Sequence, residues 1–294
     1  MIVVSWNASE TISACLKALL DQETENDYEV IVVDSGTDGT ADLVEERYPG
    51  IRLVHCATRK FPGAARNIGL DAAQSDWIGF VDADCIAGTD WINCAVASRA
   101  SGTSIIGGCI KPANPGNYLG WAPYFIEFSR WMPGMPARAV SDIATCNCVM
   151  SRDAIDQAGG FREQGYGSDT ALCWSVVAAG LSVAFDPSLA AGHTNITRLS
   201  TFLRKQAFHG QHFARMRLEV QGWGIARRLT YAAGSFLLPL LLGARLAGRV
   251  FGTARRYRIK FILVSPLVLL GLCLWSAGEM AGYLAPGNTF NRSE

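Results

Sequence analysis

The stretch WIGFVDADC, Trp77 to Cys85, places two aspartates one residue apart at the end of an apolar run. The run has the length and composition of a buried strand. An unpaired buried charge is costly, so stability alone does not explain carboxylates at such a strand end. In extended backbone Asp82 and Asp84 point the same way and can share one divalent cation, Mg²⁺ or Mn²⁺, with a diphosphate completing its shell. The alternative is a helix cap or an Asx turn before the GTDW that follows.

Strand and helix patterns alternate through the first third of the chain. The expected strands are IVVSW, EVIVVD, IRLVH and WIGFVD, and helical patterns lie between them. Such an alternation predicts right-handed βαβ crossovers in a doubly wound α/β sheet. Ligands of these sheets gather at the carboxyl ends of the strands, where Asp34 ends the second strand and Asp82 ends the fourth.

The formal net charge is zero, but it is unevenly distributed. Residues 1–197 carry 12 Lys and Arg against 23 Asp and Glu, whereas residues 198–294 carry 14 against 3. We therefore expect two regions with different surroundings. The basic residues flank long apolar runs, so an anionic membrane surface fits this region better than nucleic acid, and no nucleic-acid partner is expected.

Two apolar runs lie in the basic region. Phe261 to Ala285 contains about 18 residues without a charge, which is near the length that spans a bilayer. Leu229 to Ala244 is shorter and contains Pro239. A pair of buried core helices is the alternative. No signal peptide is visible at the N-terminus, and the nine cysteines form no CxxC pair, which favours reduced thiols in a cytosolic domain.

Four motifs, in order, resemble the inverting nucleotide-sugar glycosyltransferases of the GT-A fold, those of the family 2 type. They are VVSWN, EVIVVDSGTDGT, GAARNIGLDAA and WIGFVDADC. The resemblance covers residues 1–215 and implies a mixed, Rossmann-like sheet for this domain. It leaves residues 216–294 as a basic and apolar, membrane-associated region. Each motif alone is weak, but the four together are specific.

The resemblance implies roles for individual residues. Asp34 would meet the base and ribose of the nucleotide, with Asp38 in the same loop and Asn7 beside it. Asp82 would meet the ribose or the metal, and Asp84 the metal. Arg66 and Asn67, on the helix after Gly63, would lie beside the nucleotide and the donor sugar. The structural alternatives are a polar turn for residues 34–40 and a surface ion pair for Arg66.

The second half of the domain resembles the acceptor side of the family. There the family commonly has Glu-Asp at the start of a helix, and this chain has Ser168-Asp169. Asp169 is the candidate general base, which takes the proton from the acceptor hydroxyl, although it would also favour the dipole of that helix. A further strand is expected over LSVAFD, and His193 follows it by a short loop. His193 is a candidate further metal ligand, because some relatives use a histidine at a comparable place; a structural role is equally expected.

The positions of the charges also bear on topology. Nucleotide sugars are cytosolic, and Arg249 to Lys260 carries five basic residues, which the positive-inside tendency also assigns to the cytosol. The catalytic domain and this basic segment both lie in the cytosol if Phe261 to Ala285 spans the membrane while Leu229 to Ala244 lies in the interface or re-enters. A two-helix hairpin is the competing arrangement. We expect the cytoplasmic membrane, with the catalytic domain facing the cytosol.

The sequence therefore predicts a metal-dependent, inverting glycosyltransferase that uses a nucleotide-diphosphate sugar and a lipid-linked or cell-envelope glycan acceptor. One alternative is a sugar-phosphate nucleotidyltransferase, although its glycine-rich, basic N-terminal loop is absent from SWNASETIS. Another is a catalytically inactive, membrane-bound nucleotide-sugar sensor. The motifs do not identify the donor nucleotide or sugar, the acceptor, the linkage or the oligomeric state.

Overall fold

The computed structural model describes residues 1–285 and divides into two compact units. Unit 1 comprises Met1–Ala113, Pro136–Gln164 and Ser168–Thr194. Unit 2 comprises Asn114–Met135, Gly165–Gly167 and the described residues from Asn195 to Ala285. The domain boundary expected between residues 215 and 216 falls inside one continuous helix of unit 2, α8 (Leu199–Gln221).

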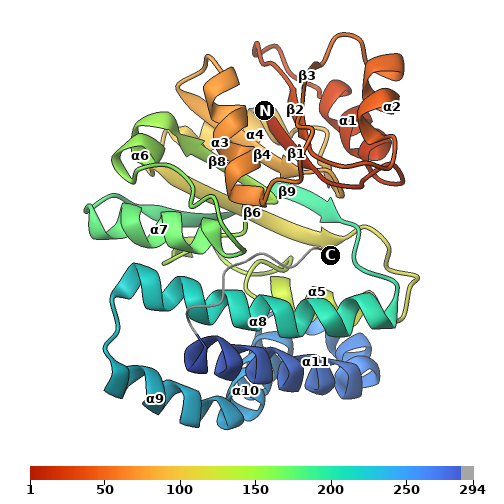
Figure 1. Ribbon diagram of the computed structural model, residues 1–294. Helices are drawn as coiled ribbons and strands as arrows, with labels where there is room; N and C mark the ends of the chain where they lie inside the picture. The colour runs from red at the N-terminus through yellow and green to blue at the C-terminus, as the bar shows by residue number, and fades with distance from the viewer. Residues whose placement is uncertain (286–294) are drawn as a thin grey trace. The chain divides into compact units, whose positions relative to one another are not determined.

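Unit 1 is built on one mixed sheet with the strand order β3-β2-β1-β4-β8-β6-β9-β5, and β7 pairs with β9 (Figure 1). The strands are β1 (Ile2–Ser5), β2 (Ile31–Asp34), β3 (Arg52–His55), β4 (Trp77–Asp82), β5 (Cys85–Ala87), β6 (Ile105–Pro112), β7 (Arg138–Ala139), β8 (Asn147–Ser151) and β9 (Val183–His193). The helices are α1 (Ile12–Leu20), α2 (Thr40–Arg47), α3 (Pro62–Ala72), α4 (Trp91–Arg99), α6 (Arg152–Gln157) and α7 (Ser168–Ala178).

The first four strands are parallel neighbours, as the alternating pattern predicts. The residues of β2 are all fully buried, which explains its unbroken Ile-Val-Val run. The sheet becomes mixed at β8, which is antiparallel to both β4 and β6. The predicted doubly wound, mixed α/β sheet is confirmed.

The strand β9 is longer than the sequence indicated. We expected a strand over LSVAFD and a short loop before His193, but β9 continues from Val183 to His193. It continues because β6 pairs with it along its length, with a register shift between Gly108 and Cys109, and β5 pairs with its end. His193 is therefore held in the sheet and is not a loop residue.

Unit 2 is helical. It contains α5 (Trp121–Phe128), α8, α9 (Ile225–Gly234), α10 (Leu238–Gly252) and α11 (Arg258–Leu284), with 3₁₀ turns at Ser235–Leu237 and Arg255–Tyr257. The apolar run over residues 229–244 is thus divided between α9 and α10. Its Pro239 lies in the first turn of α10, where a proline costs no helical hydrogen bond.

Two helical stretches of the described residues are long and apolar enough to cross a membrane, Ile225–Gly252 with mean hydropathy 1.4 and Arg255–Leu284 with mean hydropathy 2.1. Length and composition alone do not separate a spanning helix from a core helix. The distinction depends on which residues of each helix contact protein within unit 2 and which are exposed.

Candidate functional site

The candidate site lies at one edge of the unit 1 sheet, at the carboxyl ends of the parallel strands. Asp34, His55 and Asp82 are the last residues of β2, β3 and β4. Asp34 and His55 are direct partners in the parallel register, and Ser5 of β1 pairs with Asp34 on its other side. The topology therefore gathers three titratable side chains at the edge where such sheets bind ligands.

Asp34 is fully buried, and only one of its carboxylate oxygens has a partner. Its Oδ2 accepts a hydrogen bond from the Gly36 backbone N–H at 3.1 Å and lies 3.2 Å from His55 Nδ1. Its Oδ1 has no hydrogen-bond partner among residues 1–285. A buried acceptor without a donor is costly, and a ligand that brings an N–H or O–H group would remove that cost.

Asp38 lies in the loop after β2 and has a different environment. Its carboxylate accepts hydrogen bonds from the Ser9 N–H at 3.0 Å and from the N–H and hydroxyl of Thr40. Burial raises the pKa of Asp38, but these hydrogen bonds outweigh burial and lower the pKa to about 2. Asp38 therefore stabilises the start of α2, and its contact with a nucleotide stays a prediction.

Asn7 fixes the shape of the neighbouring loop. It is the one non-glycine residue with a positive φ (51°) among the described residues 1–285. Its side-chain oxygen accepts a hydrogen bond from the Thr37 N–H at 2.8 Å. Gly36 packs so closely on the Asn7 backbone that a Cβ there would overlap it. Asn7 therefore ties the end of β1 to the β2–α2 loop, and asparagine tolerates this backbone conformation.

Arg66 links the two sides of the site. Its side chain is 5% exposed, and its Nη2 donates to Asp82 Oδ1 at 2.9 Å. Its Nε has no hydrogen-bond partner in the part of the chain that the structure describes. Although burial acts in the opposite direction, Asp82 and Asp169 raise the pKa of Arg66. A surface ion pair, the structural alternative, does not describe this buried guanidinium.

Asn67 contacts the protein rather than open space. Its amide nitrogen donates to the Phe161 carbonyl at 2.8 Å, and its amide oxygen accepts from the Phe161 N–H at 2.9 Å. The side chain thus fixes the turn that precedes α7. Contact with the donor sugar stays a prediction for Asn67, and its amide is already engaged by this turn.

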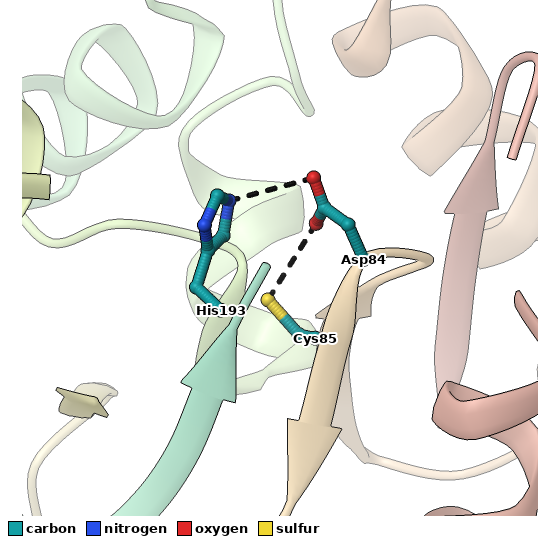
Figure 2. Close-up of side chains that lie close together, drawn as sticks. All are labelled: Asp84, Cys85 and His193. Atoms are coloured by element: carbon teal, nitrogen blue, oxygen red, sulfur yellow. Dashed lines mark hydrogen bonds and ion pairs between the residues drawn. The ribbon is translucent and has the colours of Figure 1, made fainter. Parts of the chain in front are cut away.

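The metal-ligating candidates converge beside the end of β4 (Figure 2). His193 Nε2 lies 3.5 Å from Asp84 Oδ2, and Cys85 Sγ lies 3.7 Å from Asp84 Oδ1. One ligand atom from each residue lies within 4.8 Å of the others. Their backbones explain the convergence, because Cys85 and His193 are paired in the β5–β9 register and the Thr194 N–H donates to the Asp84 carbonyl.

Asp82 and Asp84 differ although they are only two residues apart. The Asp82 carboxylate is held by Arg66, while Asp84 lies with His193. Burial and the charge of Asp84 raise the pKa of Asp82, and Arg66 acts against that rise. Asp84 and His193 therefore form the centre of the candidate metal site. Asp82 is available as a further ligand only if it shares its carboxylate with Arg66.

Asp169 lies in the first turn of α7, which begins at Ser168. Its carboxylate accepts the Thr170 N–H at 2.8 Å. Burial raises the pKa of Asp169, while Arg66 and the backbone hydrogen bonds act against that rise. A raised carboxyl pKa makes the ionised form a stronger base, as a general base requires.

The starts of α3 and α7 are in close contact. A Cβ on Gly63 would overlap the carbonyl of Arg162 and approach Ser168. The glycine therefore lets α3, which carries Arg66, pack directly against the helix that carries Asp169. This packing explains how Arg66 acts electrostatically on both Asp82 and Asp169.

Sequence reasoning did not identify His55 and Cys85. His55 ends the third predicted strand, so the rule that selected Asp34 would also have selected it. Cys85 comes next to a predicted ligand, but nothing in the residue order indicated that it lies beside His193 across a strand pair.

A family model described as Glycosyl transferase family 2 matches residues 1–159. The pre-mycofactocin glycosyltransferase of Mycobacterium tuberculosis (strain ATCC 25618 / H37Rv) is 30% identical over 193 residues, covering 62% of this chain and 40% of that protein. The amylovoran biosynthesis glycosyltransferase AmsB of Erwinia amylovora is 37% identical over 90 residues, 29% of this chain and 30% of that protein. The match thus spans well under half the length of these two relatives.

Solved structures share the fold. The mannosyltransferase PcManGT of Pyrobaculum calidifontis, in complex with GDP-Man and Mn²⁺, aligns with a TM-score of 0.66 at 19% identity, covering 97% of this chain and 85% of that one. S. aureus TarS with UDP-GlcNAc aligns with a TM-score of 0.53 at 14% identity, covering 97% of this chain and 90% of that one. At these identities the likeness concerns the fold.

Proposed function

We propose that this chain, which belongs to glycosyl transferase family 2, moves a sugar from a nucleotide-diphosphate sugar to a hydroxyl group of a lipid-linked or cell-envelope glycan. The observation that carries the proposal is the convergence of Asp34, Asp82, Asp84 and His193 at the carboxyl edge of one sheet. The relatives include glycosyltransferases of polysaccharide biosynthesis, and PcManGT and TarS were solved with nucleotide sugars.

The nucleotide would bind at the ends of β1 and β2. The unpartnered Asp34 Oδ1 would accept a hydrogen bond from the base or the ribose, because a buried carboxylate oxygen there lacks a donor. Asn7, with its positive φ, and the loop after Asp34 would line the site beside the bound nucleotide.

A divalent cation, Mg²⁺ or Mn²⁺, fits the cluster of Asp84 and His193. Their ligand atoms are close enough for one ion, and carboxylate and imidazole are ordinary ligands of Mn²⁺. When bound, the ion would act as a Lewis acid that stabilises the departing diphosphate. Arg66 would hold Asp82 in place beside it.

Asp169 would act as the general base in a single displacement. The acceptor oxygen attacks the anomeric carbon, the bond from that carbon to the diphosphate oxygen breaks, and the hydroxyl proton passes to the Asp169 carboxylate. One displacement inverts the configuration at the anomeric carbon. Burial favours the neutral form of Asp169 and raises its pKa, and the charge of Arg66 opposes that rise.

The protein would work at the cytoplasmic membrane with unit 1 in the cytosol. The donor is a cytosolic metabolite in this proposal, and the basic residues between α10 and α11 follow the positive-inside tendency. The apolar helices of unit 2 support membrane association.

Calorimetry with a panel of nucleotide-diphosphate sugars, with and without Mn²⁺, tests the donor site. The wild type should bind one of them in a metal-dependent way, and Asp84→Ala should abolish the metal dependence. Asp71→Ala, which removes an exposed carboxylate from α3, is the matched control. Equal binding by Asp84→Ala with Mn²⁺ would refute the metal site, and the absence of binding to every donor would refute the proposal.

Transfer is tested separately, since a nucleotide-sugar sensor would also bind the donor. The wild type and Asp169→Asn are incubated with the identified donor, labelled in its sugar, and with extracted membrane lipids and glycans. Label should reach an acceptor with the wild type only. Tight donor binding without turnover by either protein would favour the sensor.

A further inference from the structure

The longest apolar helix of the chain, α11, is covered along one face by other helices of unit 2. Its buried residues recur at helical spacing and form one stripe along its whole length. They are Phe261, Val264, Val268, Gly271, Leu272, Ser276, Gly278, Glu279, Gly282 and Tyr283. The first half of this stripe packs on α5, where Phe125 meets Phe261 edge to face. The second half packs on α8 (Figure 1).

The contact between α8 and α11 is close enough to involve the backbones. A Cβ on Gly210 would overlap the Trp275 carbonyl, and one on Gly278 would overlap the Ala207 carbonyl. A Cβ on Gly282 would approach the Gln211 carbonyl. The two helices therefore run side by side in the same direction, and neither can be tilted away without losing this packing.

The same contact contains a charged pair. Glu279 of α11 is 3% exposed, and its Oε1 lies 3.1 Å from Arg217 Nη1 of α8. Tyr283 and Trp275 donate to its two oxygens at 2.8 and 3.1 Å. Withdrawing α11 from α8 would leave the Glu279 carboxylate without its cation, which is costly in a low-dielectric environment.

The helix α8 is not one of the helices within residues 1–285 that are long and apolar enough to cross a membrane. It carries five charged residues, namely Arg204, Lys205, Arg215, Arg217 and Glu219. Such residues stay out of the bilayer centre unless they face a polar interior. Because α11 lies along α8, α11 cannot cross the bilayer while α8 stays outside it.

The opposite face of α11 is apolar and exposed. Its exposed large residues are Ile259, Ile262, Leu263, Leu269, Leu270, Met280 and Leu284. The segment over α9 and α10 packs against α11 and exposes a similar set, namely Ile225, Leu229, Phe236, Leu237, Leu240 and Leu241. Monomeric soluble proteins rarely expose apolar surface of this extent.

Exposed basic residues lie among these apolar side chains. They are Arg227, Arg245, Arg255, Arg256 and Lys260. Among the described residues from 198 on, the acidic residues are Glu219 and Glu279, and Glu279 is paired. A basic and apolar surface is complementary to an anionic bilayer, which offers both phosphates and acyl chains.

We propose that unit 2 attaches to an anionic membrane in the plane of the interface, and that neither α9–α10 nor α11 crosses the bilayer. The exposed apolar faces of α9–α11 enter the outer part of the acyl region, and the basic side chains meet the headgroups. This inference deepens the membrane association proposed above. It differs from both topologies that the sequence suggested, one spanning helix or a spanning hairpin.

Vesicle flotation with the purified full chain tests the lipid surface. Binding to vesicles that contain phosphatidylglycerol should exceed binding to phosphatidylcholine vesicles and should weaken with salt. Removing one basic residue, as in Arg256→Ala, should lower the partition coefficient about fivefold. Phe236→Glu with Leu240→Glu should lower it by at least about tenfold. Leu20→Glu, at an exposed leucine of α1 in unit 1, should leave it unchanged.

Protease sites test the topology in sealed inside-out membrane vesicles. One site is inserted between Gly252 and Thr253, and a second is added after Glu294. If unit 2 lies in the plane, both sites are cut without detergent, together with a site in an exposed loop of unit 1. Protection of the first site would show a hairpin, and protection of the second alone would show that α11 spans. Either result overturns the proposal.

Two further outcomes would also overturn it. If the chain ignores vesicles and forms a stable dimer that Phe236→Glu dissociates, the apolar face binds a second copy instead of lipid. If high salt or alkaline carbonate never releases the chain from native membranes, the attachment is transmembrane. Neither measurement uses a sugar donor or an acceptor. The proposed membrane attachment and the proposed reaction can therefore be refuted independently of each other.

Discussion

Two regions of the molecule hold buried carboxylates in opposite ways. In unit 2, both oxygens of Glu279 have partners, supplied by Arg217, Tyr283 and Trp275. In unit 1, Asp34 is also buried, but its Oδ1 has no partner among the described residues. The same kind of group is fully satisfied between two helices and incompletely satisfied at the edge of the sheet.

This difference separates a structural role from a binding role. A buried charge with complete partners holds two elements in register, and removing a partner costs stability. A buried acceptor with an open position leaves a place for a ligand to donate. The predictions below test whether this criterion divides the carboxylates of the chain correctly, from the largest expected effect to the smallest.

The largest effect is expected at the candidate base. Asp169→Asn should lower kcat about 10²- to 10⁴-fold, because proton transfer to a positioned side chain contributes that much. Donor affinity and the unfolding midpoint should change little, since asparagine keeps the size and can still accept the Thr170 N–H. Initial rates with saturating donor measure the effect. Activity close to that of wild type would remove Asp169 from the mechanism.

A large loss of stability is expected at Glu279. Glu279→Ala should lower the free energy of unfolding by about 3–5 kcal/mol, because it leaves Arg217 partly buried without its partner. Denaturant titration of the full chain measures it. Glu219→Ala, an exposed position on α8, should stay within about 0.5 kcal/mol of wild type. Equal values for the two variants would mean that Glu279 is not structural.

The affinity of the candidate site for Mn²⁺ should depend on the His193 imidazole. His193→Ala should raise the dissociation constant of Mn²⁺ at least about tenfold, because it removes one of the ligands near Asp84. Cys85→Ala should change it little, since a hard cation has no need of a thiol. Manganese titration followed by electron paramagnetic resonance measures both. The reverse order of effects would assign the site to a softer metal.

The pH profile tests the electrostatic link through Arg66. Burial raises the pKa of Asp169 above its ordinary value, so activity should fall as the pH drops through that raised pKa. Arg66→Gln removes the charge that opposes the rise, and the acidic limb of kcat/KM should move to higher pH. Arg66→Lys keeps a cation and should move it less. If the limb stays in place in both variants, Asp169 is not the titrating group.

The smallest effect is expected at Asp38. Asp38→Asn should lower the free energy of unfolding at pH 7 by about 0.5–1 kcal/mol, because it weakens the hydrogen bonds at the start of α2. The effect is small because the Asp38 side chain is exposed and solvent screens its charge. The folded pKa is lowered to about 2, so this stability is present above the ordinary carboxyl pKa. It is lost as the pH falls from about 4 to 2. Unfolding curves of both proteins at pH 7 and pH 3 should therefore converge at low pH.

Much of unit 1 could be predicted from the residue order, because its signals are local. Each of these parallel strands is a short apolar run, and its last residue is polar at the carboxyl edge of the sheet. That rule found Asp34 and Asp82, and it would have found His55. Asn67 has the residue type of the family motif, but the sequence did not reveal that the Phe161 turn occupies its amide.

Long-range pairing limited the rest of the prediction. The extension of β9 to His193 depends on β6 and β5, which are distant in the chain. The surroundings of α11 depend on glycines of α8 and α11 that read as ordinary helix residues. Hydropathy detects that α11 is apolar, but it does not say whether lipid or protein covers each face.

The sequence by itself determined the order of strands and helices, the carboxylates at the strand ends and the basic, apolar character of the last third. These follow from periodicity and composition, which act over a few residues. Only the tertiary structure decided which carboxylates are fully partnered, that His193 meets Asp84, and that α11 lies along α8. Those features depend on groups brought together across more than 60 residues of chain, where burial and hydrogen-bond geometry determine the free energy of each contact.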